Sequence, residues 1–197
     1  MNLLFYIPDS RELFYIIFGA MALIGVLMHL QSKNFYTLYV FVRKFSILDL
    51  EFPASALELS MYIKGIYLLP TELSSKSLRA LKGRLYLHFL FIPLLYGAIF
   101  LLCIEIGNKM NHWGNYIFTT LAVIQMIPLI CDVAENFYLL QKIHPNVSPS
   151  KLSVHKAYQL LGKIKWVIAS VAVVFAISTL FYFWLSGNFS FRSIQFL

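Results

Sequence analysis

Long runs of apolar residues, separated by two polar and basic stretches, dominate the hydropathy pattern of this chain. A transmembrane α-helix needs about 20 consecutive apolar residues to cross the hydrocarbon core of a bilayer. The runs that meet this length cover approximately 13–30, 85–106, 116–140 and 164–185. The pattern therefore predicts an all-α, polytopic membrane protein, with four transmembrane helices in a single membrane domain over residues 1–197.

The composition supports a membrane protein, because 59% of the residues are hydrophobic and only 13% are charged. Soluble domains carry about 25% charged residues. The two cysteines, Cys103 and Cys131, both lie inside apolar runs, where cysteine usually acts as a small buried hydrophobic residue. We therefore expect neither a disulfide framework nor a metal site, and no cofactor.

Basic residues gather in the two long connections between the apolar runs, 31–84 and 141–163. Of the 16 lysines and arginines, eight lie in the first connection and five lie between Lys142 and Lys165. The positive-inside rule places both connections in the cytoplasm and both termini outside. A basic inner surface is expected to meet anionic lipid headgroups. No glycine-rich loop or zinc-ligand spacing supports nucleic-acid binding, which we do not expect.

The first connection contains apolar segments that are too short to span a membrane. Ser55 and Glu58 follow Pro53 with the spacing of a capping box, which predicts the start of a helix. Its polar positions include Glu58 and Lys64. We expect an amphipathic helix that lies on the cytoplasmic surface of the bilayer. The second connection predicts a turn followed by a short basic helix.

Polar residues interrupt the third apolar run. Asp132, Glu135 and Asn136 have i, i+3 and i+4 spacing, which places them on one helix face. The helical rise puts them at about the depth of His88 in the second run. A charge at the bilayer centre costs about 2.5–3.5 kcal/mol, so these groups should point into the bundle. Their candidate partners are Arg84, Glu51, Lys163 and Lys165.

Two interpretations of this cluster remain open. Ionisable groups inside a membrane mark functional sites by default, which would make the cluster a proton relay, an ion pathway or a headgroup site. Alternatively, the groups satisfy one another and fix the helix register, and the sequence favours this interpretation. The sequence has no H-x-x-x-H, G-x-S-x-G or P-loop motif, so no catalytic residue is assigned.

Four segments carry a family resemblance: I-x-x-L-E-x-P from Ile47 to Pro53, YLHFLFIPLLY in the second run, D-x-x-E-N from Asp132 to Asn136, and Lys163, Lys165 and Trp166 before the last run. In these segments the chain resembles a family of uncharacterised bacterial four-span integral membrane proteins. The resemblance implies a location in the bacterial inner membrane and transfers no activity. His88 stands where the family pattern has aspartate, which favours a histidine–carboxylate pairing here.

The overall plan also looks like that of small membrane accessory proteins of RNA-targeting CRISPR systems, which implies an accessory role in antiviral defence. Our leading hypothesis is a non-enzymatic protein that oligomerises or assembles with a protein partner and forms or regulates a pore, since four helices enclose little space alone. The alternative is a lipid-binding or lipid-modifying protein that uses His88, Asp132 and Glu135 at the depth of the inner-leaflet headgroups.

Overall fold

The computed structural model describes residues 10–185 and is mostly helical. The elements follow in the order α1 (Ser10–Ser32), β1 (Tyr36–Leu38), β2 (Val42–Lys44), α2 (Ile47–Glu51), α3 (Ala56–Tyr67), α4 (Thr71–Asn108), α5 (His112–Ile124), α6 (Met126–Lys142) and α7 (Leu152–Leu185). The expected all-α architecture is confirmed, apart from one two-stranded hairpin.

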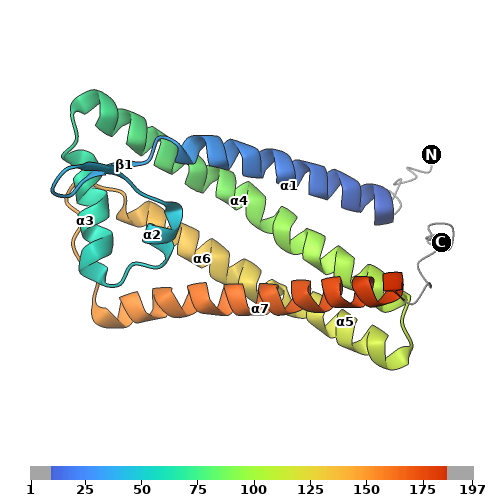
Figure 1. The fold of residues 1–197 in the computed structure, drawn as a ribbon. Helices are drawn as coiled ribbons and strands as arrows, with labels where there is room; N and C mark the ends of the chain where they lie inside the picture. Colours follow the sequence, from blue (N-terminus) through green and yellow to red (C-terminus); the bar gives the residue numbers. More distant parts are fainter. Residues whose placement is uncertain (1–9, 186–197) are drawn as a thin grey trace, which may run out of the picture.

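Within residues 10–185, four helical segments are long and apolar enough to cross a membrane: α1, α4, α5 with α6, and α7. The chain is thus a multi-pass membrane protein, as the hydropathy pattern predicted. In Figure 1 the segments run side by side, and α1 begins at the end of the bundle where α7 finishes. The hairpin, α2 and α3 gather at the opposite end, which we call the α3 end.

Two of the spanning helices are longer than their apolar runs. Helix α4 begins at Thr71 rather than near residue 85, and α7 begins at Leu152 rather than near residue 164. The additional turns contain part of the basic residues of the two connections, namely Lys76, Arg79, Lys82 and Arg84 in α4 and Lys156 and Lys163 in α7. Lysine and arginine are good helix formers, so a polar, basic stretch can continue a helix beyond the apolar segment. Hydropathy locates the apolar run and leaves the helix ends undetermined.

The third span consists of two helices that meet at Gln125, which is both the C-cap of α5 and the N-cap of α6. Pro128 lies in the first turn of α6. Proline has no backbone N–H and its ring clashes with the carbonyl four residues earlier, here that of Ile124. The chain therefore breaks its helix immediately after Ile124.

The hairpin of β1 and β2 lies in the first connection, ahead of the predicted amphipathic helix. Its strands pair antiparallel, with Tyr36 opposite Lys44. Aromatic and β-branched residues favour strands, and the segment is rich in both. The strands pass close to α3 at Gly65, where a Cβ atom would clash with the carbonyl oxygen of Leu38. Glycine is therefore needed for this contact.

The predicted start of α3 is confirmed. The hydroxyl of Ser55 accepts a hydrogen bond from the backbone N–H of Glu58 at 3.1 Å, and the Glu58 carboxylate accepts one from the N–H of Ala54 at 2.6 Å. The apolar face of α3, including Ile63 and Ile66, is buried within the protein. Its placement on a bilayer surface stays a prediction.

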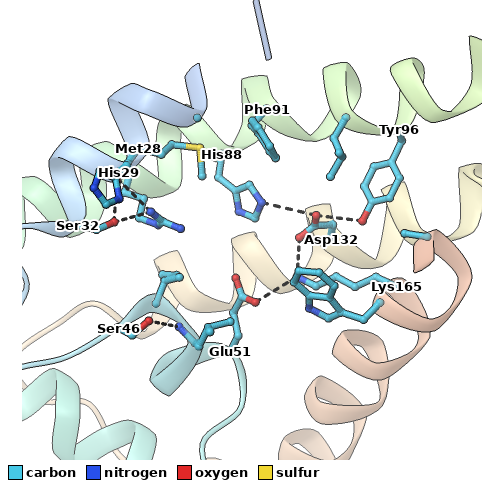
Figure 2. A pocket seen from close by; sticks show the side chains of 17 residues that line it. Met28, His29, Ser32, Ser46, Glu51, His88, Phe91, Tyr96, Asp132 and Lys165 are labelled. Atoms are coloured by element: carbon cyan, nitrogen blue, oxygen red, sulfur yellow. Dashed lines mark hydrogen bonds and ion pairs between the residues drawn. The ribbon is translucent and has the colours of Figure 1, made fainter. Parts of the chain in front are cut away.

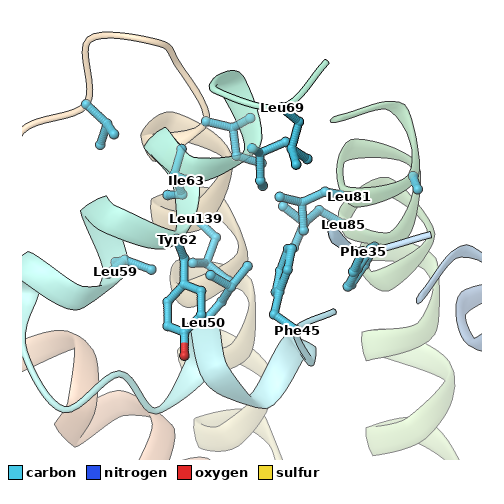
Figure 3. Packing of buried hydrophobic residues seen from close by; sticks show 14 of the residues in the cluster. Phe35, Phe45, Leu50, Leu59, Tyr62, Ile63, Leu69, Leu81, Leu85 and Leu139 are labelled. Carbon is cyan, nitrogen blue, oxygen red and sulfur yellow. The ribbon is translucent and has the colours of Figure 1, made fainter. Parts of the chain in front are cut away.

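In the described part of the chain, buried apolar side chains form two separate cores. The α3-end core, drawn in Figure 3, joins the hairpin, α2, α3 and the adjoining turns of α4 and α6. The mid-bundle core joins α4, α5, α6 and α7 farther along the spans. Helix α4 contributes Leu85 to the first core and Ile92 to the second. About two helical turns of α4 therefore separate the two cores, and this segment carries His88.

Candidate functional site

The predicted charged residues meet at the junction of the two cores. Lys165 of α7 lies at their centre and is only 4% exposed. Its Nζ is 2.8 Å from Oδ1 of Asp132 and forms an ion pair with the carboxylate of Glu135. It also lies 3.9 Å from Oε2 of Glu51. An ammonium has three N–H donors, so Lys165 is the common positive partner of three carboxylates.

Asp132 connects α6 to α4 as well as to α7. Its Oδ2 accepts a hydrogen bond from the hydroxyl of Tyr96 at 3.2 Å. The same oxygen lies 3.6 Å from Nε2 of His88, which is beyond ordinary hydrogen-bond distance. Figure 2 shows the side chains of His88 and Tyr96 both directed towards Asp132. The pairing of histidine with carboxylate is thus present, in a loose geometry.

Glu135 and Asn136 hold α6 against its neighbours. The side-chain amide of Asn136 donates a hydrogen bond to the carbonyl oxygen of Leu85 at 2.8 Å. Glu135 packs against Gly162 of α7, where a Cβ atom would lie 2.7 Å from Oε1 of Glu135. Asn136 therefore has a structural contact, and Gly162 provides the space for the buried carboxylate.

Glu51 reaches the cluster because α2 is fastened to α7. The hydroxyl of Tyr158 donates a hydrogen bond to the carbonyl oxygen of Leu50 at 2.8 Å. The side-chain amide of Gln159 donates one to the carbonyl oxygen of Pro53 at 2.9 Å. Burial raises the pKa of the Glu51 carboxyl above its ordinary value of 4.5, and nearby Lys165 offsets part of this rise.

The remaining predicted partners behave differently. Arg84 turns towards α1, where its Nη1 donates to the carbonyl oxygen of Met28 at 3.0 Å and to the hydroxyl of Ser32. Lys163 is exposed. The predicted cluster of His88, Asp132, Glu135 and Asn136 is brought together, with Glu51 and Lys165 as its partners.

A cavity of about 550 Å³ lies beside the cluster. Its polar lining consists of side chains from α1, α2, α4, α6 and α7, chiefly those of Ser32, Glu51, Arg84, His88, Tyr96, Asp132 and Lys165. Its apolar lining includes Met28, Leu48, Phe91, Leu95 and Ala169. Trp166 also lines it and is half-exposed, so the cavity reaches the surface of the bundle.

The lining changes from polar to apolar in one direction. On α4, Arg84 is nearest to the α3 end, and Phe91 and Leu95 follow along the same face. Helix α1 runs in the opposite direction, so its Ser32 is near the α3 end and Gly25 lies deeper. The exceptions are Asp132 and Tyr96 at the inner wall, and Ile47 and Leu48 of α2 near the α3 end. The charged lining thus lies mainly towards the α3 end, and the lining towards the middle of the bundle is largely apolar.

Sequence reasoning missed two contributors. Tyr96 was not among the predicted site residues, although it lies two helical turns after His88 on the same side of α4. Gly162 lies three residues before Lys165, a spacing that places both on one face of α7. Among residues 10–185, no His, Cys, Asp and Glu side chains form a group of three or more that could hold a metal ion.

No protein-family model, curated protein or solved structure matches the chain. The family resemblance based on the D-x-x-E-N motif therefore stays a prediction, and the site is interpreted from its own chemistry.

Proposed function

We propose that this protein binds a membrane lipid, or an amphiphile of similar shape, in the cavity between α1, α4 and α7. The observation that carries the proposal is the change in the cavity lining, from charged groups near the α3 end to Phe91 and Leu95 deeper in the bundle. A lipid has the same division into a polar head and an apolar tail. The cavity volume of about 550 Å³ is also within the usual range for small-molecule sites.

The structural interpretation of the cluster explains only part of the arrangement. Mutual satisfaction accounts for the contacts among Lys165, Asp132 and Glu135. Buried ion pairs stabilise a fold only when they are closely packed and fully paired. Here Arg84, His88 and Glu51 instead line an open volume. Charged groups that line a cavity inside a membrane bundle favour a binding site.

Two glycines of α1 offer a matched test. Gly25 lines the cavity, and a Cβ atom there would lie 3.7 Å from the ring of Phe91. A Cβ atom on Gly19 would have no atom of the described residues within 4 Å. Gly25→Phe should therefore fill the cavity, whereas Gly19→Phe adds the same side chain to the same helix away from it.

The measurement is native mass spectrometry of each purified variant in mild detergent. We expect wild type and Gly19→Phe to retain lipid and Gly25→Phe to lose most of it. Equal retention by both variants, or no retained lipid in wild type, would contradict the proposal. The same spectra give the number of chains in each particle, which tests our separate hypothesis of an oligomeric pore.

A further inference from the structure

The cavity contains a negative group that the protein pairs incompletely. Glu51 is 8% exposed, and its Oε2 has no hydrogen-bond donor among residues 10–185. The nearest ammonium, that of Lys165, is 3.9 Å away and has closer contacts with two other carboxylates. An unpaired carboxylate oxygen in a buried site is costly. The raised pKa of Glu51 agrees with incomplete pairing.

The cavity also contains a positive group with donors to spare. In the described part of the chain, both hydrogen bonds of Arg84 come from Nη1. A guanidinium has five N–H donors in a planar fork, so Nε and Nη2 remain for a ligand. This fork suits the oxygens of a phosphate. Figure 2 shows His88 from α4 and Glu51 from α2 entering the cavity from opposite sides.

We infer that the head group bound in this cavity is that of an ethanolamine phospholipid, with its ammonium on Glu51 and its phosphate on Arg84. This inference rests on the proposed function and specifies its ligand class. An anionic phospholipid without an amine, such as phosphatidylglycerol, would satisfy Arg84 and leave Oε2 of Glu51 without an ammonium donor. A choline head group carries positive charge but has no N–H to donate. A primary ammonium supplies both a positive charge and the N–H donors that Oε2 of Glu51 lacks.

A methylation series tests the inference without altering the protein. Phosphatidylethanolamine, its N-methyl and N,N-dimethyl derivatives, and phosphatidylcholine, all with the same acyl chains, keep phosphate and charge while N–H donors are lost in turn. Their binding to the full chain in mild detergent is compared by native mass spectrometry. We expect affinity to fall along the series, by about tenfold in total, since a hydrogen bond to a charged group is lost.

Substitutions then assign the preference to Glu51. Glu51→Gln should bring the affinities for phosphatidylethanolamine and phosphatidylcholine close together. Glu72→Gln removes the same charge from an exposed position in the first turn of α4 and should leave the preference unchanged. Free phosphoethanolamine is the third probe, and it should compete at least a hundredfold more weakly than the lipid because it lacks the acyl chains.

The outcomes separate the two proposals. Equal binding along the methylation series, or tighter binding of phosphatidylglycerol, overturns the ethanolamine assignment while lipid binding itself stands. If free phosphoethanolamine competes as strongly as the lipid, the head group is not bound as part of a lipid, and the lipid assignment is overturned. Failure of every lipid to bind wild type removes the proposed function and the inference together. A preference for phosphatidylethanolamine that Glu51→Gln abolishes and Glu72→Gln retains supports the inference.

Discussion

The two described cores of this protein differ in the share of small side chains that they bury. The α3-end core buries large residues completely, such as Phe35, Ile63 and Leu81. The residues buried most completely in the mid-bundle core include small ones, such as Ala122 and Ala172. Helices inside a membrane associate through close contacts between small residues, because lipid tails are as apolar as the side chains. The α3-end core resembles a soluble domain, in which burial of large apolar surfaces stabilises the fold.

The charged cluster lies where these two kinds of packing meet. Leu85 and Leu139 belong to the α3-end core, whereas Ile92 belongs to the mid-bundle core. His88 lies on α4 between Leu85 and Ile92. Glu135 lies on α6, one helical turn before Leu139. The junction is therefore neither fully packed nor fully apolar, and it contains the cavity.

The largest effect is expected from removing the central positive charge. Lys165→Met leaves buried Asp132 and Glu135 without their ammonium, which should reduce the free energy of unfolding by about 3–5 kcal/mol. Thermal unfolding in detergent measures the loss. Lys163→Met, at an exposed position two residues earlier, is the control and should change stability by less than about 0.5 kcal/mol. Similar losses in both variants would mean that the cluster is not the cause.

The next effect concerns the α3-end core, which should be sensitive to lost volume. Ile63 is 0% exposed, so Ile63→Ala should reduce the free energy of unfolding by about 2–4 kcal/mol through lost burial and a residual cavity. Leu57→Ala, on the same helix at a position that is 55% exposed, serves as the control. Chemical denaturation measures the free energy of unfolding of both variants. If Ile63→Ala lowered it no more than Leu57→Ala does, the comparison with a soluble core would fail.

The smallest effect concerns the mid-bundle core, which should be sensitive to added volume. Ala172 is 0% exposed at a helix contact, and Ala172→Leu should cost about 1–3 kcal/mol because the helices are forced apart. The same replacement at exposed Ala134 of α6 should be nearly neutral. Denaturation in detergent measures both. An Ala172→Leu variant as stable as wild type would show that this core is not closely packed.

Much of the fold followed from the sequence. The four spans were predictable from run length, because a chain in lipid must satisfy every backbone hydrogen bond within its own helices. The start of α3 was predictable from Ser55 and Glu58, since a cap is a local contact. The hairpin was not, because it depends on close contact with Gly65 of α3, a residue far along the chain.

For the candidate site, too, the sequence predicted some features and left others open. Helical rise and periodicity alone brought His88, Asp132 and Glu135 to one depth and placed the two acids on one face. Whether Lys163 or Lys165 would pair with them depended on the face of α7 that packs against α6, which the sequence left open.

The cavity itself was decided entirely by tertiary structure. Its walls come from α1, α2, α4, α6 and α7, whose positions are set by packing between segments far apart in the chain. Periodicity determines how deep a residue lies and which helix face it occupies. It carries no information about which neighbour meets that face, or whether the helices close the space between them.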